Sequence, residues 1–330
     1  MKKMQTHGSM NNLAWKISSC GQLALLIEAS APKPGNVSRI NRFSDTEYRH
    51  YLSSAAQAGK GIFRAAQTGV WLAEEKLDYN QSNLGELILL SEKEALGGFA
   101  GQNTVFGAIL LLIPLTVALS SSIAHRGEVN SALVEECLGR LIENTTVEDA
   151  IAFSRSFEMI EFRDYEKKQD RDWNEIHERY DMTNSEIRDN IRMDKLTLGE
   201  LLRISAPIDP LCREISESYP LVLHELYPRL SSMSQAIEGI EEAVVKLFIW
   251  LLSERVDGHI LRKKGLETAQ LVREKARETI SSYDLNENLG GAVAHLEESL
   301  PSGINPGTTA DFIAGTIMYW LVDKRFLTSQ

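Results

Sequence analysis

The stretch that decides the fold is Val105-Phe-Gly-Ala-Ile-Leu-Leu-Leu-Ile-Pro114-Leu-Thr-Val-Ala-Leu119, the most apolar run in the chain. A helix that spans a bilayer needs about 20 predominantly apolar residues. This run is shorter than that and contains Pro114. We therefore expect a helix buried at the centre of a folded protein, and no membrane partner.

Helical spacing continues on both sides of this run. Apolar residues recur at three- and four-residue steps from Ile17 to Ile27 and, with smaller side chains, from Leu52 to Phe63. The same spacing occurs in segments 83–96, 103–120, 131–143, 147–162, 197–205, 211–229, 234–253, 265–282 and 308–322. Runs that alternate apolar and polar residues are scarce. The pattern predicts an all-α fold, a single-domain bundle over residues 1–330 with roughly ten or more helices.

Polar residues at the expected helix starts suggest capping boxes, in which a hydroxyl and a carboxylate three residues later satisfy free amides. The candidate pairs are Ser44 with Glu47, Thr145 with Glu148, and Thr308 with Asp311. Acidic and basic residues crowd between 163 and 196, where few apolar residues occur. That composition predicts a solvated helix, or a charged loop or insertion, within the single domain.

The composition limits the possible partners. The chain has 330 residues and a formal net charge of −11, so a long basic groove for nucleic acid is not expected. Its three cysteines and seven histidines form neither a Cys-x-x-Cys nor a His-x-x-x-His pair, which argues against a zinc site or a disulfide framework. The first ten residues are polar and lack the apolar stretch of a signal peptide. A cytoplasmic location is expected.

Four short stretches are not explained by a simple core helix, and the first is Glu28-Ala-Ser-Ala-Pro-Lys33-Pro-Gly35-Asn36. We expect a helix to end near Ser30, after which two prolines fix the backbone and Gly35 permits a positive φ. Such a rigid turn can present backbone amides and Lys33 to a phosphate. A plain helix terminator explains the same residues equally well.

The second stretch is Gly97-Gly-Phe-Ala-Gly101-Gln-Asn103-Thr104-Val-Phe-Gly107, which leads into the apolar run. Glycines before a helix can form an anion cradle, because the free amides and the helix dipole point the same way. No Gly-Lys-Ser/Thr follows, so the stretch is not a P-loop. A tight turn capped by Asn103 is at least as good an explanation.

The third stretch, Asp257-Gly-His259-Ile-Leu-Arg262-Lys-Lys-Gly265, holds the densest basic cluster of this acidic chain. The cluster suits a polyphosphate. Helix C-termini also collect Lys and Arg, because these residues complement the dipole, and this explanation is slightly the better one.

The fourth stretch is Asn305-Pro-Gly-Thr308-Thr-Ala-Asp311. Thr308 as a helix cap, with Asp311 three residues later, is an adequate structural account. The functional alternative makes Asp311 a metal ligand or a general base at a helix start. On this stretch alone, the structural account is favoured.

Taken together and in this order, the four stretches resemble the triphosphoribosyl-dephospho-CoA synthase family over about residues 15–322. The most specific pieces are Pro32-Lys-Pro-Gly-Asn36 after Glu28, Asn103-Thr-x-x-Gly107, and Asn305-Pro-Gly-Thr-Thr-Ala-Asp311. Thr145-Thr-Val-Glu-Asp-Ala150 and Ser205-Ala-Pro-Ile-Asp209 lie where the archaeal-type branch of the family has similar segments.

The resemblance implies an all-α enzyme that transfers a pentosyl group. Members of the family take ATP and 3′-dephospho-CoA, release adenine, and form 2′-(5″-triphosphoribosyl)-3′-dephospho-CoA. That product is the precursor of the prosthetic group of citrate lyase and malonate decarboxylase. Positive charge develops on the ribose during such a transfer, so one carboxylate is needed to stabilise it and another to accept the hydroxyl proton. The retained triphosphate needs cationic groups and Mg²⁺.

The resemblance also places the site residues. The expected acidic catalytic set is Glu28, Asp45 and Asp311, with Asp149 and Asp209 behind them. Glu28, Asp45, Asp149 and Asp311 are the candidate Mg²⁺ ligands, and the base is not distinguished from the ligands. The expected substrate- and phosphate-binding residues are Lys33, Gly35, Asn36, Arg39, Gly101, Asn103, Thr104, Gly107, His259, Arg262, Asn305 and Thr308.

Two features depart from the bacterial citrate-lyase members of the family. Their Asn-Thr pair is followed by His-Lys, whereas Val105-Phe106 follow here, so a lysine that could contact phosphate is missing. Their Asp-Met-Asp type segment is replaced by Ser44-Asp-Thr-Glu47. Similar archaeal-type proteins accompany tetrahydromethanopterin biosynthesis, so the acceptor is either dephospho-CoA or a hydroxyl-bearing pterin intermediate. A non-catalytic helical nucleotide-binding protein is the remaining alternative.

Overall fold

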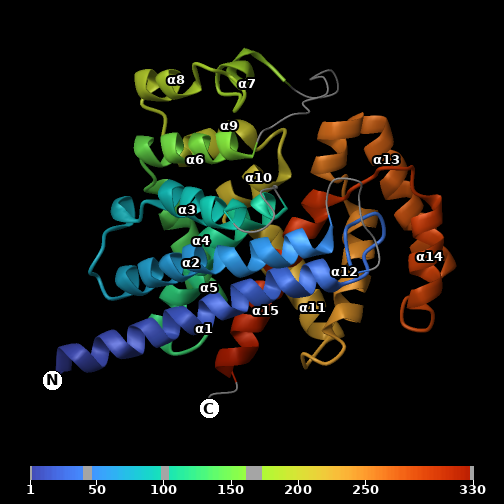
Figure 1. Ribbon diagram of the computed structural model, residues 1–330, viewed down its shortest axis with the longest axis horizontal. Helices are drawn as coiled ribbons and strands as arrows, with labels where there is room; N and C mark the ends of the chain where they lie inside the picture. Colours follow the sequence, from blue (N-terminus) through green and yellow to red (C-terminus); the bar gives the residue numbers. More distant parts are fainter. Residues whose placement is uncertain (1, 40–46, 98–103, 161–172, 328–330) are drawn as a thin grey trace.

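The chain folds as a bundle of packed helices (Figure 1). The structure, a computed structural model, describes residues 2–39, 47–97, 104–160 and 173–327. These residues form fifteen α-helices, and no strand occurs among them. The prediction of an all-α fold with ten or more helices is therefore confirmed.

The apolar run lies at the centre of the molecule as α4 (Phe106–Arg126). It packs against α1 (Lys2–Ser30), α2 (Tyr48–Ala73), α3 (Leu84–Leu96), α5 (Ser131–Glu143) and α15 (Gly307–Leu327). By length and composition alone α4 could cross a membrane, but 89% of its most apolar window is buried inside the protein. It is thus surrounded by other helices, as the shortness of the run and its proline predict.

The charged region, predicted as a solvated helix or as a charged loop or insertion, contains two short helices where the structure describes it. They are α7 (Glu175–Arg179) and α8 (Ile187–Asp194). α8 packs against α6 (Val147–Met159), and α7 packs against α9 (Leu198–Ser205). Ile187 and Ile191 of α8 are buried. Of the two alternatives, the helix describes α8 better, because a helix of two turns needs only a few apolar anchors among its charged neighbours.

The helix predicted over 211–229 is broken into three pieces. These are α10 (Pro210–Ser216), a π-helical segment η3 (Val222–Leu226) and α11 (Tyr227–Met233). Ser218 and Tyr219 both have positive φ, 66° and 67°, which ends α10. The carboxylate of Glu214 then accepts the amides of Leu221 and Val222 at 3.2 and 2.8 Å, so the backbone donors at the restart are satisfied.

The remaining helices build the opposite side of the bundle. They are α12 (Ile240–Glu254), α13 (Gly258–Ser282) and α14 (Leu289–Ser299), of which α14 was not predicted. α12 packs against both α13 and α15, and α13 packs against α14. Figure 1 shows α13 and α14 at one end of the molecule, away from α7 and α8.

Two of the three predicted capping boxes are displaced. Thr146, not Thr145, caps α6, and its partner is Asp149. α15 begins at Gly307, and the amide of Ala310 donates to the carbonyl of Pro306, so Thr308 is already inside the first turn. Ser44 lies outside the described residues, and Glu47 pairs with His50 at the start of α2. Asp311 is therefore not needed as a cap for α15.

Candidate active site

The described parts of the four stretches converge on the first turn of α15. Asn36 donates its side-chain amide to Asn305 Oδ1 at 2.9 Å, which joins the first stretch to the fourth. Gly107 packs against Asp311, and His259 packs against Gly307. Residues that are far apart in the sequence thus surround one helix start, as expected of a functional site rather than of separate helix ends.

The turn after α1 is held against the segment that precedes α15. Gly35 has φ +69° and donates its amide to Glu297 Oε2 at 2.7 Å. A Cβ at Gly35 would lie 2.8 Å from Leu300 Cδ1, so a larger residue would push the turn away. The structure therefore shows Gly35 and Asn36 fastening the turn to its neighbours.

Lys33, predicted to face a phosphate, points into the protein. Its side chain is fully buried, and its Nζ lies 3.0 Å from Glu28 Oε1. The same amine donates to the backbone carbonyls of Glu28 and Ala31. A buried ammonium needs such oxygen partners, and this requirement turns Lys33 inward. Its observed role is to hold the carboxylate of Glu28.

Asp311 lies in close contact with the start of α4. A Cβ built on Gly107 would lie 2.0 Å from Asp311 Oδ2, so only a glycine leaves room for this carboxylate. The pKa of Asp311 lies well above its usual value, first because the surrounding protein removes the carboxylate from water, and then because Glu28 and Asp257 repel its charge. Nearby Arg262 partly offsets this rise.

Asp257 belongs to the same site, although it was not among the predicted residues. Its Oδ1 accepts the amide of Ile260 at 2.9 Å and caps α13. Its Oδ2 accepts both the amide and the hydroxyl of Thr309, at 2.7 and 2.8 Å. Burial raises the pKa of Asp257, and these hydrogen bonds lower it again. In the sequence, Asp257 stands directly before Gly258 and His259. That position indicates a helix cap and does not by itself indicate a site residue.

His259 and Arg262 extend the site from α13. Burial, with the charges of Arg262 and Lys263, lowers the pKa of His259 to about 3, so its imidazole is neutral at physiological pH. Arg262 Nη1 lies 3.4 Å from Asp209 Oδ2. Gly265, at φ 84°, interrupts the helix just after the basic cluster. The cluster therefore lies at a helix end, as its structural explanation predicts, and also beside the acidic residues.

The other predicted residues have varied surroundings. Thr104 donates its hydroxyl to Ser54 at 2.8 Å. Arg39 is exposed and lies 3.3 Å from Glu241. The carboxylate of Asp149 serves the capping box of α6 and accepts the amide of Gly85 at 2.9 Å, so the structure gives it a structural role. Asp45, Gly101 and Asn103 lie outside the described residues.

The acidic residues do not form a ready metal cage. Within the described part of the chain, no three or more His, Cys, Asp or Glu side chains are arranged to hold a metal ion. Mg²⁺ in nucleotide-dependent enzymes is usually held by one or two carboxylates together with substrate phosphates. The described residues therefore do not fit a metal bound by protein alone, and a metal here would need substrate phosphates as further ligands.

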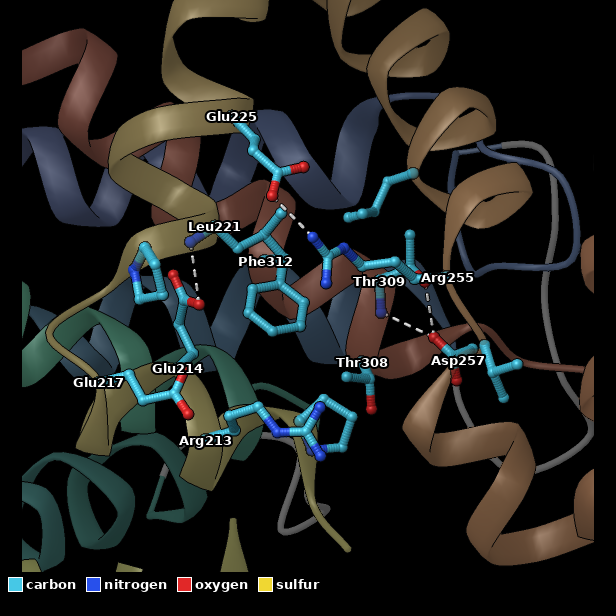
Figure 2. A pocket seen from close by; sticks show the side chains of 14 residues that line it. Arg213, Glu214, Glu217, Leu221, Glu225, Arg255, Asp257, Thr308, Thr309 and Phe312 are labelled. Carbon is cyan, nitrogen blue, oxygen red and sulfur yellow. Dashed lines mark hydrogen bonds and ion pairs between the residues drawn. The ribbon is translucent and has the colours of Figure 1, made fainter. Parts of the chain in front are cut away.

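A cavity of about 250 Å³ adjoins the site on another face of α15. Thr308 and Phe312, four residues apart, line it, whereas Gly307 and Asp311 lie on the neighbouring face. Figure 2 shows Asp257 and Thr309 at one wall and Glu214 with Leu221 at the other. Glu28, Asp257 and Asp311 form the acidic group of the site. Asp257 thus belongs both to this acidic group and to the lining of the cavity.

Comparisons with known proteins agree with this architecture. The sequence pattern of the family "ATP:dephospho-CoA triphosphoribosyl transferase" matches residues 14–329. A Streptococcus equi subspecies zooepidemicus protein named "Probable 2-(5''-triphosphoribosyl)-3'-dephosphocoenzyme-A synthase" is 26% identical over 135 residues, or 40% of this chain and 45% of the relative. A crystal structure from Archaeoglobus fulgidus, provisionally named a triphosphoribosyl-dephospho-CoA synthase, has a TM-score of 0.56 at 21% identity, covering 82% of this chain and 97% of its own. That likeness is one of fold.

Fold and site together define an all-α protein in which Glu28, Asp257 and Asp311 lie near one another at the start of a core helix. The family match covers nearly the whole chain. The chain therefore belongs to the ATP:dephospho-CoA triphosphoribosyl transferase family, and the resemblance read from the four stretches is confirmed.

Proposed function

We propose that the protein transfers the triphosphoribosyl group of ATP to the 2′-hydroxyl of 3′-dephospho-CoA and releases adenine. The observation that carries the proposal is the convergence of Glu28, Asp257 and Asp311 on one helix start in a chain of this family. The match to the streptococcal relative spans less than half of that relative's length. The proposal therefore depends mainly on the family and on the site.

The residues can share the chemistry as follows. The bond between ribose C1′ and the adenine nitrogen breaks with its electron pair going to the base, and a bond forms between C1′ and the acceptor oxygen. Glu28, held by Lys33, supplies negative charge to the cationic ribose. We assign to Asp311 the acceptance of the hydroxyl proton, because its raised pKa makes its carboxylate a stronger base than that of an ordinary aspartate.

The triphosphate is assigned to the basic side of the site. Arg262 is partly buried between Asp209 and the acidic group, and the exposed Lys263 and Lys264 follow it on α13. We propose that Mg²⁺ enters with the triphosphate and that Glu28 and Asp311 face it. No observation favours a pterin acceptor, and we retain dephospho-CoA. A cytoplasmic location of the protein remains part of the proposal.

The test is incubation of the purified protein with ATP, Mg²⁺ and 3′-dephospho-CoA, followed by chromatography and mass spectrometry. The expected result is free adenine in equal amount to an acceptor that has gained one triphosphoribosyl group. Absence of both products with properly folded protein would overturn the proposal. If adenine is released only with a different hydroxyl acceptor, ATP is kept as the donor and dephospho-CoA is rejected as the acceptor.

A further inference from the structure

The cavity between α10, η3, α12 and α15 is of a size that suits one ring system. Its volume of about 250 Å³ lies below the roughly 300–1,000 Å³ of pockets that enclose drug-sized ligands. It could therefore hold a part of a nucleotide but not the whole molecule. Because it shares Asp257 and Thr308 with the site, the remainder of such a ligand would extend toward the acidic group.

The charges of the lining disfavour a phosphate. Four carboxylates and two arginines line the cavity. Arg255 is paired with Glu225 at 2.7 Å, and Arg213 donates to the carbonyls of Ala206 and Pro207 at 3.0 and 3.2 Å. An anionic group would thus meet four carboxylates, while both arginines are already engaged. A neutral ligand that donates hydrogen bonds is favoured, because ionised carboxylates only accept them.

The apolar part of the lining suits a flat ring. Phe312 is 5% exposed, and its ring lies between the Glu214 side and the Thr309 side of the cavity (Figure 2). Aromatic side chains bind bases by stacking on the ring face. The other apolar lining residues are Pro210, Pro220, Leu221, Leu251 and Val256. The combination of an aromatic floor and hydrogen-bond acceptors matches a heterocycle that carries an amino group.

We propose that this cavity binds the purine base of the nucleotide donor, with Phe312 against the ring and the carboxylates of Glu214 and Glu217 facing its amino group. The inference rests on the proposed function, because that function requires an adenine nucleotide beside Asp311. It explains why Thr308 and Asp311 occupy neighbouring faces of one helical turn: the base would lie on one face and the reacting ribose on the other.

Equilibrium binding tests the inference without requiring turnover. Calorimetry is performed with ATP and with ITP, in which an oxo group replaces the amino group. We expect the wild-type protein to bind ATP at least tenfold more tightly than ITP, because the oxo group would face carboxylates. We expect Glu217→Gln to reduce this preference severalfold. Glu267→Gln, at an exposed glutamate of α13 that does not line the cavity, is the matched control and should keep it.

The stacking surface is tested with Phe312→Ala, for which at least tenfold weaker ATP binding is expected, with unchanged binding of dephospho-CoA. If circular dichroism shows that this variant is unfolded, Phe312→Leu and Val256→Phe replace it, since one removes the aromatic ring and the other fills the cavity. Unchanged ATP affinity in folded cavity variants, with an unchanged ATP-to-ITP ratio in Glu217→Gln, would overturn the inference. Absence of adenine release from a wild-type protein that binds ATP in this way would instead overturn the proposed function.

Discussion

At the level of single residues, the proposed transfer depends on the contact between Asp311 and the start of α4. Gly107 approaches the carboxylate so closely that a methyl group cannot be added without displacing it. Glu28 and Asp257 raise the cost of charging Asp311, and Arg262 lowers it. The residue is thus held in place by packing and tuned by charge, which is the arrangement expected of a proton acceptor.

Gly107→Ala is predicted to lower adenine release by at least tenfold, because the new Cβ would lie 2.0 Å from Asp311 Oδ2 and must displace it. Steady-state kinetics measure the loss, and urea unfolding measures the accompanying change in stability. Gly127→Ala, at the exposed end of α4, provides a comparison: its φ of 83° strains an alanine, but nothing lies within 4 Å of its Cβ. Equal loss of activity in both variants would show that a general loss of stability, not displacement of Asp311, is responsible.

Glu92 offers a test of burial that is independent of the function. It is 1% exposed, its Oε2 has no hydrogen-bond partner among the described residues, and burial raises its pKa to about 8. Between its ordinary pKa of 4.5 and this value the native state binds more protons than the unfolded state. Stability therefore falls as pH rises through this window, by at most about 1.4 kcal/mol per pH unit.

Glu92→Gln is predicted to remove that decline, so the variant gains stability relative to the wild-type protein as pH increases from 5 to 8. Urea unfolding at several pH values gives the difference in unfolding free energy between the variant and the wild-type protein. The contributions of the other titrating groups cancel in this difference. A difference that stays constant across the window would contradict the raised pKa.

The sequence indicated the importance of individual residues better than their roles. Lys33 was identified from its two flanking prolines, but burial turns it toward Glu28 instead of outward. Asp257 was missed as a site residue because a cap at a helix start explains its type, and its bond to Thr309 joins segments 52 residues apart. Such contacts arise from packing between helices and leave no periodic signal in the chain.

At the scale of elements, α13 and α15 are joined through Asp257, which caps one helix and accepts two hydrogen bonds from the other. This link fixes the first turn of α15 and so the relative positions of Thr308 and Asp311. The separation between cavity and acidic group is therefore set by one side chain.

Asp257→Asn is predicted to cost about 1–3 kcal/mol of stability. Asparagine has only one side-chain oxygen, so either the amide of Ile260 or the amide and hydroxyl of Thr309 lose their acceptor. Thr309→Val is predicted to cost about 0.5–1.5 kcal/mol, and the double variant less than the sum. Urea unfolding of all three variants checks the values. Strict additivity would show that the two residues do not act as a link.

The sequence predicted uninterrupted helices well and the breaks between helices poorly. The bounds of α3 and α5 agree with their apolar spacing to within a residue, since three or more turns repeat the pattern. The break in 211–229 was not predicted because two non-glycine residues, Ser218 and Tyr219, adopt positive φ. Tertiary contacts overrode local preference there: Tyr219 is fully buried and donates its hydroxyl to Leu111 of α4 at 2.8 Å.

At the scale of the whole molecule, the chain carries a net charge of −11 yet is proposed to bind polyanions. The structure reconciles the two, because Arg262, Lys263 and Lys264 lie together beside the site while many acidic residues are exposed elsewhere. The local charge beside the site therefore bears on ligand binding more than the net charge of the whole chain does.

Removal of divalent cations is predicted to abolish adenine release, because the carboxylates near Asp311 repel a triphosphate and the basic residues neutralise it only in part. Adenine release is measured in excess chelator and again after Mg²⁺ is restored. Full activity in chelator would show that Arg262 and its neighbours suffice, and would remove the metal from the proposal.

The most direct test of the central claim, that the carboxylates at the start of α15 carry out the transfer, is the rate of adenine release by Asp311→Asn. We expect the rate of adenine release to fall by about 10²–10⁴-fold, with unchanged stability. Asp189→Asn, at an exposed aspartate of α8, is the matched control and should retain full activity. An Asp311→Asn protein that is less stable yet releases adenine at the wild-type rate would contradict the account.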